Sequence, residues 1–356
     1  MQKETTDYFN KLSEFYSSKR PFVIFRKPNE TLVTTYVQNN DKVHFLNSFG
    51  EQGFIFSPFN KSEKKILFPI DKCSVLTSKI SKNKDLEIAK SISNYNVISN
   101  EKEQGNHIKL VQKGIDFLKN ETVKKVVLSR KENIDCINFD AINTLKKILN
   151  NYKNAFVYLW YHPSIGLWMG ATPERLINVT QSKFKTMALA GTQLYKNSIN
   201  VVWKEKEQQE QQFVTDYILD TIKDSIENIK LSETYTVRAG NLLHLRTDIS
   251  GDLKYPEILG NLIASLHPTP AVCGLPKDKA TKFILENENY NRAYYSGYLG
   301  ELNINSSTNL FVNLRCMEVT NNIASIYIGG GITIDSNPKS EWDETVSKAE
   351  VMKKVL

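Results

Sequence analysis

The order of the elements predicted along this chain indicates an α+β protein in which mixed or antiparallel sheets pack against helices. Several strand-like apolar runs follow one another directly, as at 155–161, 166–169 and 175–180. A doubly wound nucleotide-binding fold would instead alternate each strand with a helix. The chain has 356 residues, which is enough to bury a large core, and we expect 1–356 to form a single domain.

Within this domain, the part at 1–105 carries weaker signals than the part at 106–356, which holds the motifs. Early strand-like runs lie at 22–25, 42–46 and 65–68, and a polar stretch at 78–105 resembles an exposed, flexible connection. Further strands are predicted at 125–128, 155–161, 166–169, 175–180, 184–189, 236–245, 310–319 and 323–328. Helices are predicted at 108–120, 140–150, 204–229, 255–266, 277–288 and 341–356.

The composition excludes several classes of protein. Hydrophobic residues make up 40% of the chain and charged residues 24%, as in ordinary globular proteins. No apolar run approaches the roughly 20 residues of a membrane-spanning helix, and the N-terminus lacks the apolar stretch of a secretory signal. We therefore expect no membrane contact and a cytoplasmic location, with the four scattered cysteines reduced. The net charge of +7 comes from lysines mixed with acidic residues, so nucleic-acid binding is not expected.

The most informative segment lies near the C-terminus. Three glycines at 329–331 are interpreted as a tight turn after a strand, and a predicted helix follows them. On this helix Glu341, Glu344 and Lys348 are spaced three and four residues apart and share one face. Two carboxylates and a cation on one face suit a hard metal ion that bridges to an anionic ligand. The glycines alone are only a turn signal, because no Lys-Ser/Thr pair follows them as in a phosphate-binding loop.

A second pair of carboxylates lies on the predicted helix at 204–229. Glu207 and Glu210 are again three residues apart and share a face. Either pair alone could be an ordinary solvated helix face. Together the two pairs could hold one divalent cation, and Mg²⁺ fits best because it takes oxygen ligands and no cluster of His or Cys favours zinc.

A set of motifs in fixed order resembles the chorismate-utilising enzymes. This family includes isochorismate synthase, anthranilate synthase component I, aminodeoxychorismate synthase and salicylate synthase. The resemblance runs from about residue 106 to the C-terminus. Its motifs are KVVLSR at 125–130, GATPERL at 170–176, LAGT at 189–192, LHPTPAVCG at 266–274, RAYYSG at 292–297 and the glycine-to-lysine segment at 329–348.

The resemblance implies both a fold and a pair of catalytic groups. The implied fold is an α/β sandwich like that of anthranilate synthase component I, with two antiparallel sheets packed together and flanked by helices around a site for Mg²⁺ and chorismate. Lys125 is implied as the general base on a water molecule, which marks the members that add water. Strand alternation then leaves the adjacent Lys124 facing solvent. Glu174 is implied as the general acid that protonates the departing C4 hydroxyl of chorismate.

The resemblance also assigns residues to the substrate. Arg315 and Tyr295 are implied at a carboxylate of chorismate, His244 near its ring, and Lys348 near the metal-bound end. The three glycines would offer backbone N–H groups, and Arg292 is expected to support the site structurally. The substrate-binding set is Ala190, Gly191, Thr192, His244, Tyr295, Arg315, Gly329, Gly330, Gly331 and Lys348, and the Mg²⁺-binding set is Glu207, Glu210, Glu341 and Glu344.

These residues favour an isochorismate synthase, which adds water at C2 of chorismate and releases the C4 hydroxyl. Ala190 stands where aminodeoxychorismate synthases often have a nucleophilic lysine, and alanine cannot perform that chemistry. A salicylate synthase-type lyase, an anthranilate synthase-like amination and a non-catalytic chorismate-binding protein stay open as alternatives. Gln211 is a departure, because many relatives have histidine there. We expect a monomer whose product feeds menaquinone or siderophore synthesis.

Overall fold

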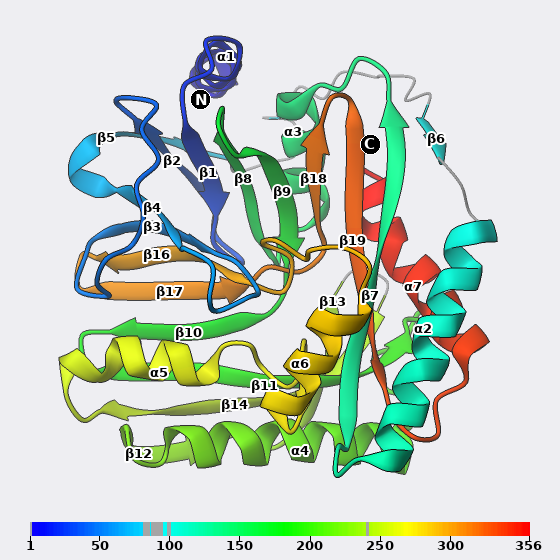
Figure 1. The fold of residues 1–356 in the computed structure, drawn as a ribbon. Coiled ribbons are helices and arrows are strands. Elements are labelled where there is room, and N and C mark those ends of the chain that lie inside the picture. Colours follow the sequence, from blue (N-terminus) through cyan, green and yellow to red (C-terminus); the bar gives the residue numbers. More distant parts are fainter. Residues whose placement is uncertain (1, 81–85, 87–94, 98–100, 240–241) are drawn as a thin grey trace.

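The computed structural model describes residues 2–80, 86, 95–97, 101–239 and 242–356. In this part of the chain two large sheets lie together with helices around them (Figure 1). All of their strand pairings are antiparallel. The predicted fold class is therefore confirmed.

Each sheet draws strands from both ends of the described sequence. The ten-stranded sheet has the order β15 (Gly274–Leu275), β7 (Lys125–Cys136), β19 (Ile323–Ile332), β18 (Cys316–Thr320), β9 (Gly166–Thr172), β8 (Phe156–His162), β1 (Phe22–Arg26), β2 (Leu32–Gln38) and β5 (Cys73–Lys79), with β6 (Tyr95–Val97) on β7. The nine-stranded sheet has the order β12 (Ile226–Leu231), β14 (Leu242–Leu253), β11 (Lys183–Leu194), β10 (Arg175–Thr180), β17 (Ser307–Val312), β16 (Tyr298–Ile304), β3 (Gly53–Ser57) and β4 (Ile66–Pro69), with β13 (Tyr235–Ala239) on β14. The helices are α1 (Gln2–Ser17), α2 (Glu101–Asn120), α3 (Ala141–Asn151), α4 (Glu205–Ile222), α5 (Leu259–Leu266), α6 (Lys277–Asn287) and α7 (Pro338–Lys353).

Successive side chains of a strand point to opposite faces of its sheet and so enter different apolar layers. In β8, Phe156 and Trp160 belong to an aromatic core between the sheets, whereas Val157 and Leu159 belong to the core beneath the helices. The ring of Phe156 stacks on Phe311 of the other sheet with centroids 4.2 Å apart. Apolar clusters on the two outer faces include residues of α1, α3 and α7 on one side and of α4 and α5 on the other. The result is a sandwich with three apolar layers.

Two predicted strands are each divided in the structure. The run at 310–319 forms β17 in one sheet and β18 in the other, and Arg315 between them has a φ of 48°. This left-handed conformation redirects the chain from one sheet to the next. The run at 236–245 forms β13 and the start of β14, which pair with each other. Both predictions of a single strand were wrong.

Other boundaries also differ from the predictions. The helix predicted at 204–229 ends at Ile222, and the following residues form β12. The run at 42–46 is not a strand and contributes only an isolated bridge between Phe45 and Ile66. Helix α1 and strands β2, β3, β5 and β16 were not predicted. Much of the polar stretch at 78–105 lies outside the described residues, although α2 begins within it at Glu101.

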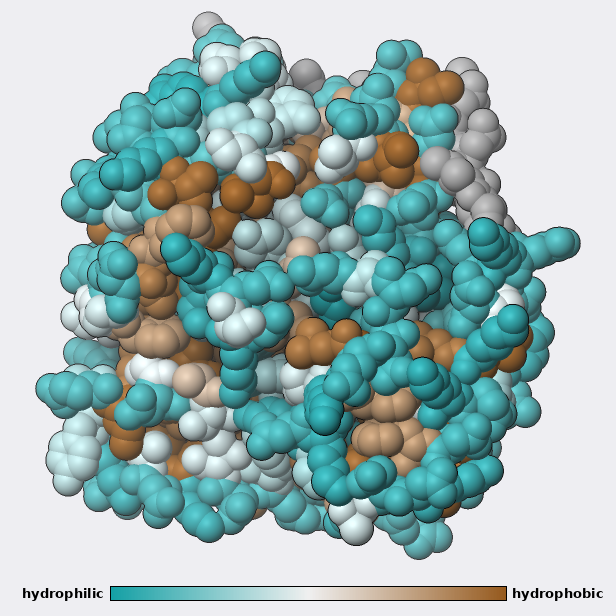
Figure 2. All heavy atoms as spheres, viewed as in Figure 1, coloured by the Kyte–Doolittle hydropathy of each residue, from teal (hydrophilic) through white to brown (hydrophobic). Residues whose placement is uncertain are grey.

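One face of the molecule is seen in the space-filling view (Figure 2). The face shown in Figure 2 is mainly hydrophilic, with hydrophobic residues in separate groups. Among the described residues, no helix is long and apolar enough to cross a membrane.

Candidate active site

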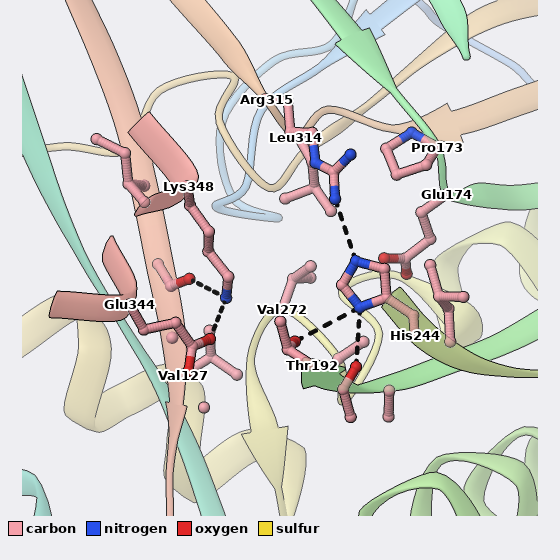
Figure 3. A pocket seen from close by; sticks show the side chains of 18 of the residues that line it. Val127, Pro173, Glu174, Thr192, His244, Val272, Leu314, Arg315, Glu344 and Lys348 are labelled. Atoms are coloured by element: carbon pink, nitrogen blue, oxygen red, sulfur yellow. Dashed lines mark hydrogen bonds and ion pairs between the residues drawn. The ribbon is translucent and has the colours of Figure 1, made fainter. Parts of the chain in front are cut away.

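All of the predicted site residues line one cavity of about 200 Å³. They come from β7, β11, β14, β19, α4, α7 and the segments before β10, β16 and β18. In Figure 3, Lys348 and Glu344 lie on one side of this cavity, with His244, Arg315 and Glu174 on the other. The fold therefore gathers at one place side chains that are more than two hundred residues apart in sequence.

Lys125 is the first residue of β7 and faces the cavity. Its ammonium lies 3.8 Å from Glu210 Oε2, and Val127, two residues along the strand, lines the same cavity. Lys124 is exposed, and its ammonium lies 4.6 Å from the centre of the Phe213 ring. Of the two adjacent lysines, the structure brings only Lys125 to the cavity.

Glu174 lies in the turn between β9 and β10 and is only 5% exposed. Its backbone N–H donates to Thr172 Oγ1 at 3.3 Å, and its carboxyl Oε1 accepts from Thr269 Oγ1 at 3.3 Å. Burial raises the pKa of Glu174 from 4.5 to about 7, although Thr269, Lys125 and Arg315 oppose this rise. A carboxyl with this pKa is partly protonated near neutral pH and can donate a proton.

His244 on β14 is held as a neutral imidazole between the other site groups. Nδ1 lies 2.8 Å from the carbonyl of Gly191 and 3.5 Å from Thr192 Oγ1. Because a carbonyl only accepts, we assign the ring proton to Nδ1, which leaves Nε2 to accept from Arg315 Nη2 at 3.1 Å (Figure 3). Burial and the adjacent Arg315 lower the pKa of His244 to about 3, so the ring stays uncharged.

Arg315 supplies a partly buried cation at the same wall. Its position between β17 and β18 directs the guanidinium toward the cavity beside His244. Burial lowers the pKa of Arg315 to about 10, which still leaves it charged at neutral pH. A guanidinium at a cavity wall can bind a substrate carboxylate through a forked pair of hydrogen bonds.

The predicted residues of β11 lie at a bulge. Pairing with β14 shifts register between Ala190 and Gln193, and Gly191 has a φ of 69°, a conformation that favours glycine. An added Cβ at Gly191 would lie 3.1 Å from the Cβ of Glu207, so α4 packs closely here. The bulge turns the carbonyl of Gly191 and the hydroxyl of Thr192 toward His244.

The lysine and glutamates of α7 form a polar wall. Lys348 Nζ lies 2.6 Å from Glu344 Oε1 and donates to the carbonyl of Gly329 at 3.0 Å. This cation lowers the pKa of Glu344. Glu341 is 7% exposed, and burial raises its pKa. The predicted sharing of one helix face by these three side chains is confirmed, because all of them line the cavity.

The fit of these carboxylates to a metal ion is partial. Glu207 Oε2 is buried and has no hydrogen-bond partner among the described residues, which suits an oxygen ligand of a hard cation. Within the same described residues, no three side chains of His, Cys, Asp or Glu form a metal-binding group. Lysine ammonium groups instead approach two of the carboxylates, Lys348 at Glu344 and Lys125 at Glu210. The donor chemistry fits Mg²⁺, and the coordination by four glutamates stays a prediction.

The three glycines at 329–331 are not a turn, contrary to the prediction. They lie inside β19 and pair with Ser129, Leu128 and Val127 of β7. A regular strand here places the glycine backbone along the wall of the cavity. Backbone N–H donation from these glycines to substrate stays a prediction.

Arg292 supports the site from behind, as predicted. It is 3% exposed, and its Nε and Nη2 donate to the carboxylate of Glu288 at 2.7 and 2.6 Å. The same guanidinium donates to the carbonyls of Val127 at 2.7 Å and Val272 at 3.0 Å, and lies 5.8 Å from the centre of the Tyr295 ring. One buried ion pair therefore fixes β7, the segment before β15 and Tyr295 relative to one another.

Gln211 ties α4 to the sheet. Its Nε2 donates to the carbonyl of Ala188 on β11 and to Thr247 Oγ1 on β14, each at 3.1 Å. The side chain is 2% exposed and does not line the cavity. At this position the chain uses glutamine to anchor the helix that carries Glu207 and Glu210.

Sequence reasoning missed several residues that line the cavity. Lys206 lies four residues before Glu210 on α4, so helical spacing could have indicated it. The apolar walls carry no local signal of function, because their side chains resemble any core residue. They include Val127, Pro173, Leu189, Ala271, Val272 and Leu314.

Comparison with known proteins identifies the family of this chain and agrees with its fold. The family model described as "Chorismate binding enzyme" matches residues 56–356, which is most of the chain. The protein therefore belongs to the chorismate-binding enzyme family.

Particular relatives extend the comparison. The chain is 28% identical over 244 residues to "Isochorismate synthase MenF" of Escherichia coli, a match that covers 65% of this chain and 56% of that protein. The structure resembles the putative 2,3-dihydroxybenzoate-specific isochorismate synthase DhbC of Bacillus anthracis, with a TM-score of 0.81 and 21% identity over 98% of this chain and 99% of that one. It also resembles anthranilate synthase component I of Streptococcus pneumoniae, with a TM-score of 0.67 and 18% identity over 93% and 89% of the two chains.

Proposed function

We propose that this protein is an isochorismate synthase, an isomerase that converts chorismate to isochorismate. The observation that carries the proposal is that a lysine and a protonatable glutamate, Lys125 and Glu174, face one cavity that is also lined by the cation Arg315. Similarity to proteins named as isochorismate synthases supports the same reaction. The matched part of the chain corresponds to only about half of that relative, so the activity is a proposal for this protein.

The two catalytic groups divide the reaction between them. Lys125, as general base, takes a proton from a water molecule, and the water oxygen forms a bond to C2 of chorismate. The ring double bonds shift, the bond from C4 to its hydroxyl breaks, and protonated Glu174 gives its proton to the departing oxygen. One water is consumed and one is released, so substrate and product are isomers.

The remaining residues hold the substrate. Arg315 and the hydroxyl of Tyr295 bind one carboxylate of the chorismate dianion. Neutral His244 keeps the Arg315 guanidinium in place through its Nε2 lone pair. When Mg²⁺ is bound by Glu207, Glu210, Glu341 and Glu344, it supplies positive charge for the other carboxylate.

Product separation after incubation with chorismate and Mg²⁺ tests the proposal. We expect isochorismate as the sole product, both with and without ammonium ions. Salicylate with pyruvate would identify a lyase, and anthranilate formed with ammonium would identify an aminating enzyme. An absence of turnover with chorismate still bound would indicate a binding protein. The choice between menaquinone and siderophore synthesis rests on the enzymes that consume the product.

A further inference from the structure

Each of the three glycines at 329–331 of β19 leaves space for a different side chain of the site. An added Cβ at Gly331 would lie 2.5 Å from Cε and 3.0 Å from Nζ of Lys125. At Gly329 it would lie 2.7 Å from the hydroxyl of Tyr295. An added Cβ at Gly330 would point to the opposite face of the strand and lie 3.3 Å from Glu341 Oε2.

Backbone conformation does not explain these glycines. The glycines with positive φ among the described residues are Gly166, Gly191, Gly274 and Gly300, so those at 329–331 adopt angles open to any residue. They pair in regular register with β7, where side chains are normally favoured over glycine. What the strand requires here is the absence of side chains.

We propose that Gly331 is a positioning residue for Lys125. Lys125 begins β7 and lies diagonally across the strand pair from Gly331, which pairs with Val127. Its side chain crosses directly over Gly331 on the way to the cavity, closer than the roughly 3.5–4.0 Å separation of ordinary carbon contacts would allow if a methyl group were there. Any side chain at 331 displaces the lysine ammonium from the cavity.

The contact at Gly331 is unusually specific. The three atoms nearest to an added Cβ are Cε, Nζ and Cδ of Lys125, the far end of one flexible side chain, and none belongs to the backbone. By contrast, an added Cβ at Gly329 also approaches the backbone oxygen of Leu128 at 3.1 Å. The substitution Gly331→Ala therefore moves one side chain and leaves the strand pairing intact.

The kinetic test rests on the proposed function. For Gly331→Ala we expect kcat to fall by on the order of 100-fold, the range associated with removal of a general base, while KM changes little. The control is Gly105→Ala on α2, a residue that does not line the cavity and where an added Cβ would meet nothing within 4 Å, and we expect kcat to stay near the wild-type value. Wild-type kcat in Gly331→Ala would overturn the proposal.

A second test needs no turnover. Thermal unfolding is measured for the wild type, Gly331→Ala, Lys125→Ala and the double variant, so that the coupling between the two positions is obtained. We expect Gly331→Ala to lower the unfolding midpoint of the wild type and not that of Lys125→Ala, in which the obstructing atoms are gone. Equal shifts in both backgrounds would contradict a role through Lys125. If this coupling appears in a protein that does not convert chorismate, the proposed function fails and the positioning role stands.

Discussion

Glu174 shows how burial alone can make a side chain reactive. In solvent its carboxyl would be ionised at neutral pH and unable to protonate a leaving hydroxide. In the cavity, burial raises its pKa to about 7, and neighbouring Lys125 and Arg315 keep the rise from going further. His244 illustrates the opposite case, because burial keeps it neutral and suited to hold Arg315 rather than to donate protons.

The first prediction concerns the pH dependence that Glu174 imposes. The general-acid role proposed for Glu174 requires the protonated carboxyl, so kcat/KM should fall as pH rises through about 7. Glu174→Gln should lower kcat on the order of 100-fold or more and abolish this decline. Steady-state kinetics across pH measure both effects, and a decline that persists in the variant would assign it to another group.

Glu174 should also affect stability. Because its pKa in the folded protein lies above the ordinary 4.5, its contribution to stability is fully present below pH 4.5 and is lost as pH rises to about 7. Glu174→Gln should therefore unfold at higher denaturant concentration than the wild type above pH 7, and this advantage should vanish near pH 4.5. Urea titrations at several pH values would reveal the crossover; a constant difference would contradict it.

The second prediction compares two adjacent lysines. Lys125→Ala should abolish turnover while chorismate still binds, because the lysine is proposed to activate water rather than to hold the substrate. Lys124→Ala should keep nearly full activity, since Lys124 is exposed and lies against Phe213 instead of the cavity. Kinetics combined with calorimetric binding separate the two variants. Retained turnover in Lys125→Ala would place the base elsewhere.

At the scale of elements, strand β7 is fixed by a buried ion pair. Arg292 and Glu288 are each about 2% exposed in their side chains and meet at 2.6 Å, and the guanidinium also binds the carbonyl of Val127. Such a pair is costly to break, because the remaining partner is left charged and unpaired.

The third prediction concerns this ion pair. Arg292→Met should destabilise the protein by about 3–5 kcal/mol because it leaves Glu288 uncompensated. The control is the exposed pair of Lys282 and Glu286 on the preceding helix α6, whose charged groups are 3.9 Å apart, and Lys282→Met should cost about 1 kcal/mol or less. Chemical denaturation measures both. Similar small losses would show that the buried pair does not hold β7.

The sequence predicted some elements of the fold from periodicity, and it predicted the site residues from motifs. Strong periodicity predicted β10 at its observed bounds and α6 within one residue. The apolar run through Leu314 hides the passage between sheets, since periodicity cannot detect a change of partner strand. The site residues were predicted from motifs whose order is tied to a family. The space-making role of Gly331 could not be predicted, because it depends on a side chain that arrives from another strand.

At the scale of the whole molecule, the two-sheet sandwich brings distant helices to one cavity. Helix α4 from the middle of the chain and α7 from its end both present carboxylates there, and the closely packed sheets hold them in place. The proposed Mg²⁺ would therefore link two layers of the fold rather than one local segment.

The fourth prediction follows from this link. Mg²⁺ should raise the unfolding midpoint, with a gain of about 2.7 kcal/mol at a concentration 100 times its Kd. Glu207→Gln should reduce the gain, because Glu207 Oε2 is buried without a hydrogen-bond partner among the described residues and suits the ion. Thermal shift assays with Mg²⁺ and with a chelator test this. A gain that the substitution leaves unchanged would show that the ion does not bind to α4.

The protein is also expected to be a monomer, and light scattering should report the mass of a single chain.

The central claim is that water, activated at Lys125, becomes the new hydroxyl of the product. Turnover of chorismate with Mg²⁺ in water enriched in the heavy oxygen isotope tests it most directly. We predict isochorismate with one heavy oxygen at C2 from the wild type and none from Lys125→Ala. Unlabelled isochorismate, or a product of amination or pyruvate loss, would contradict the account.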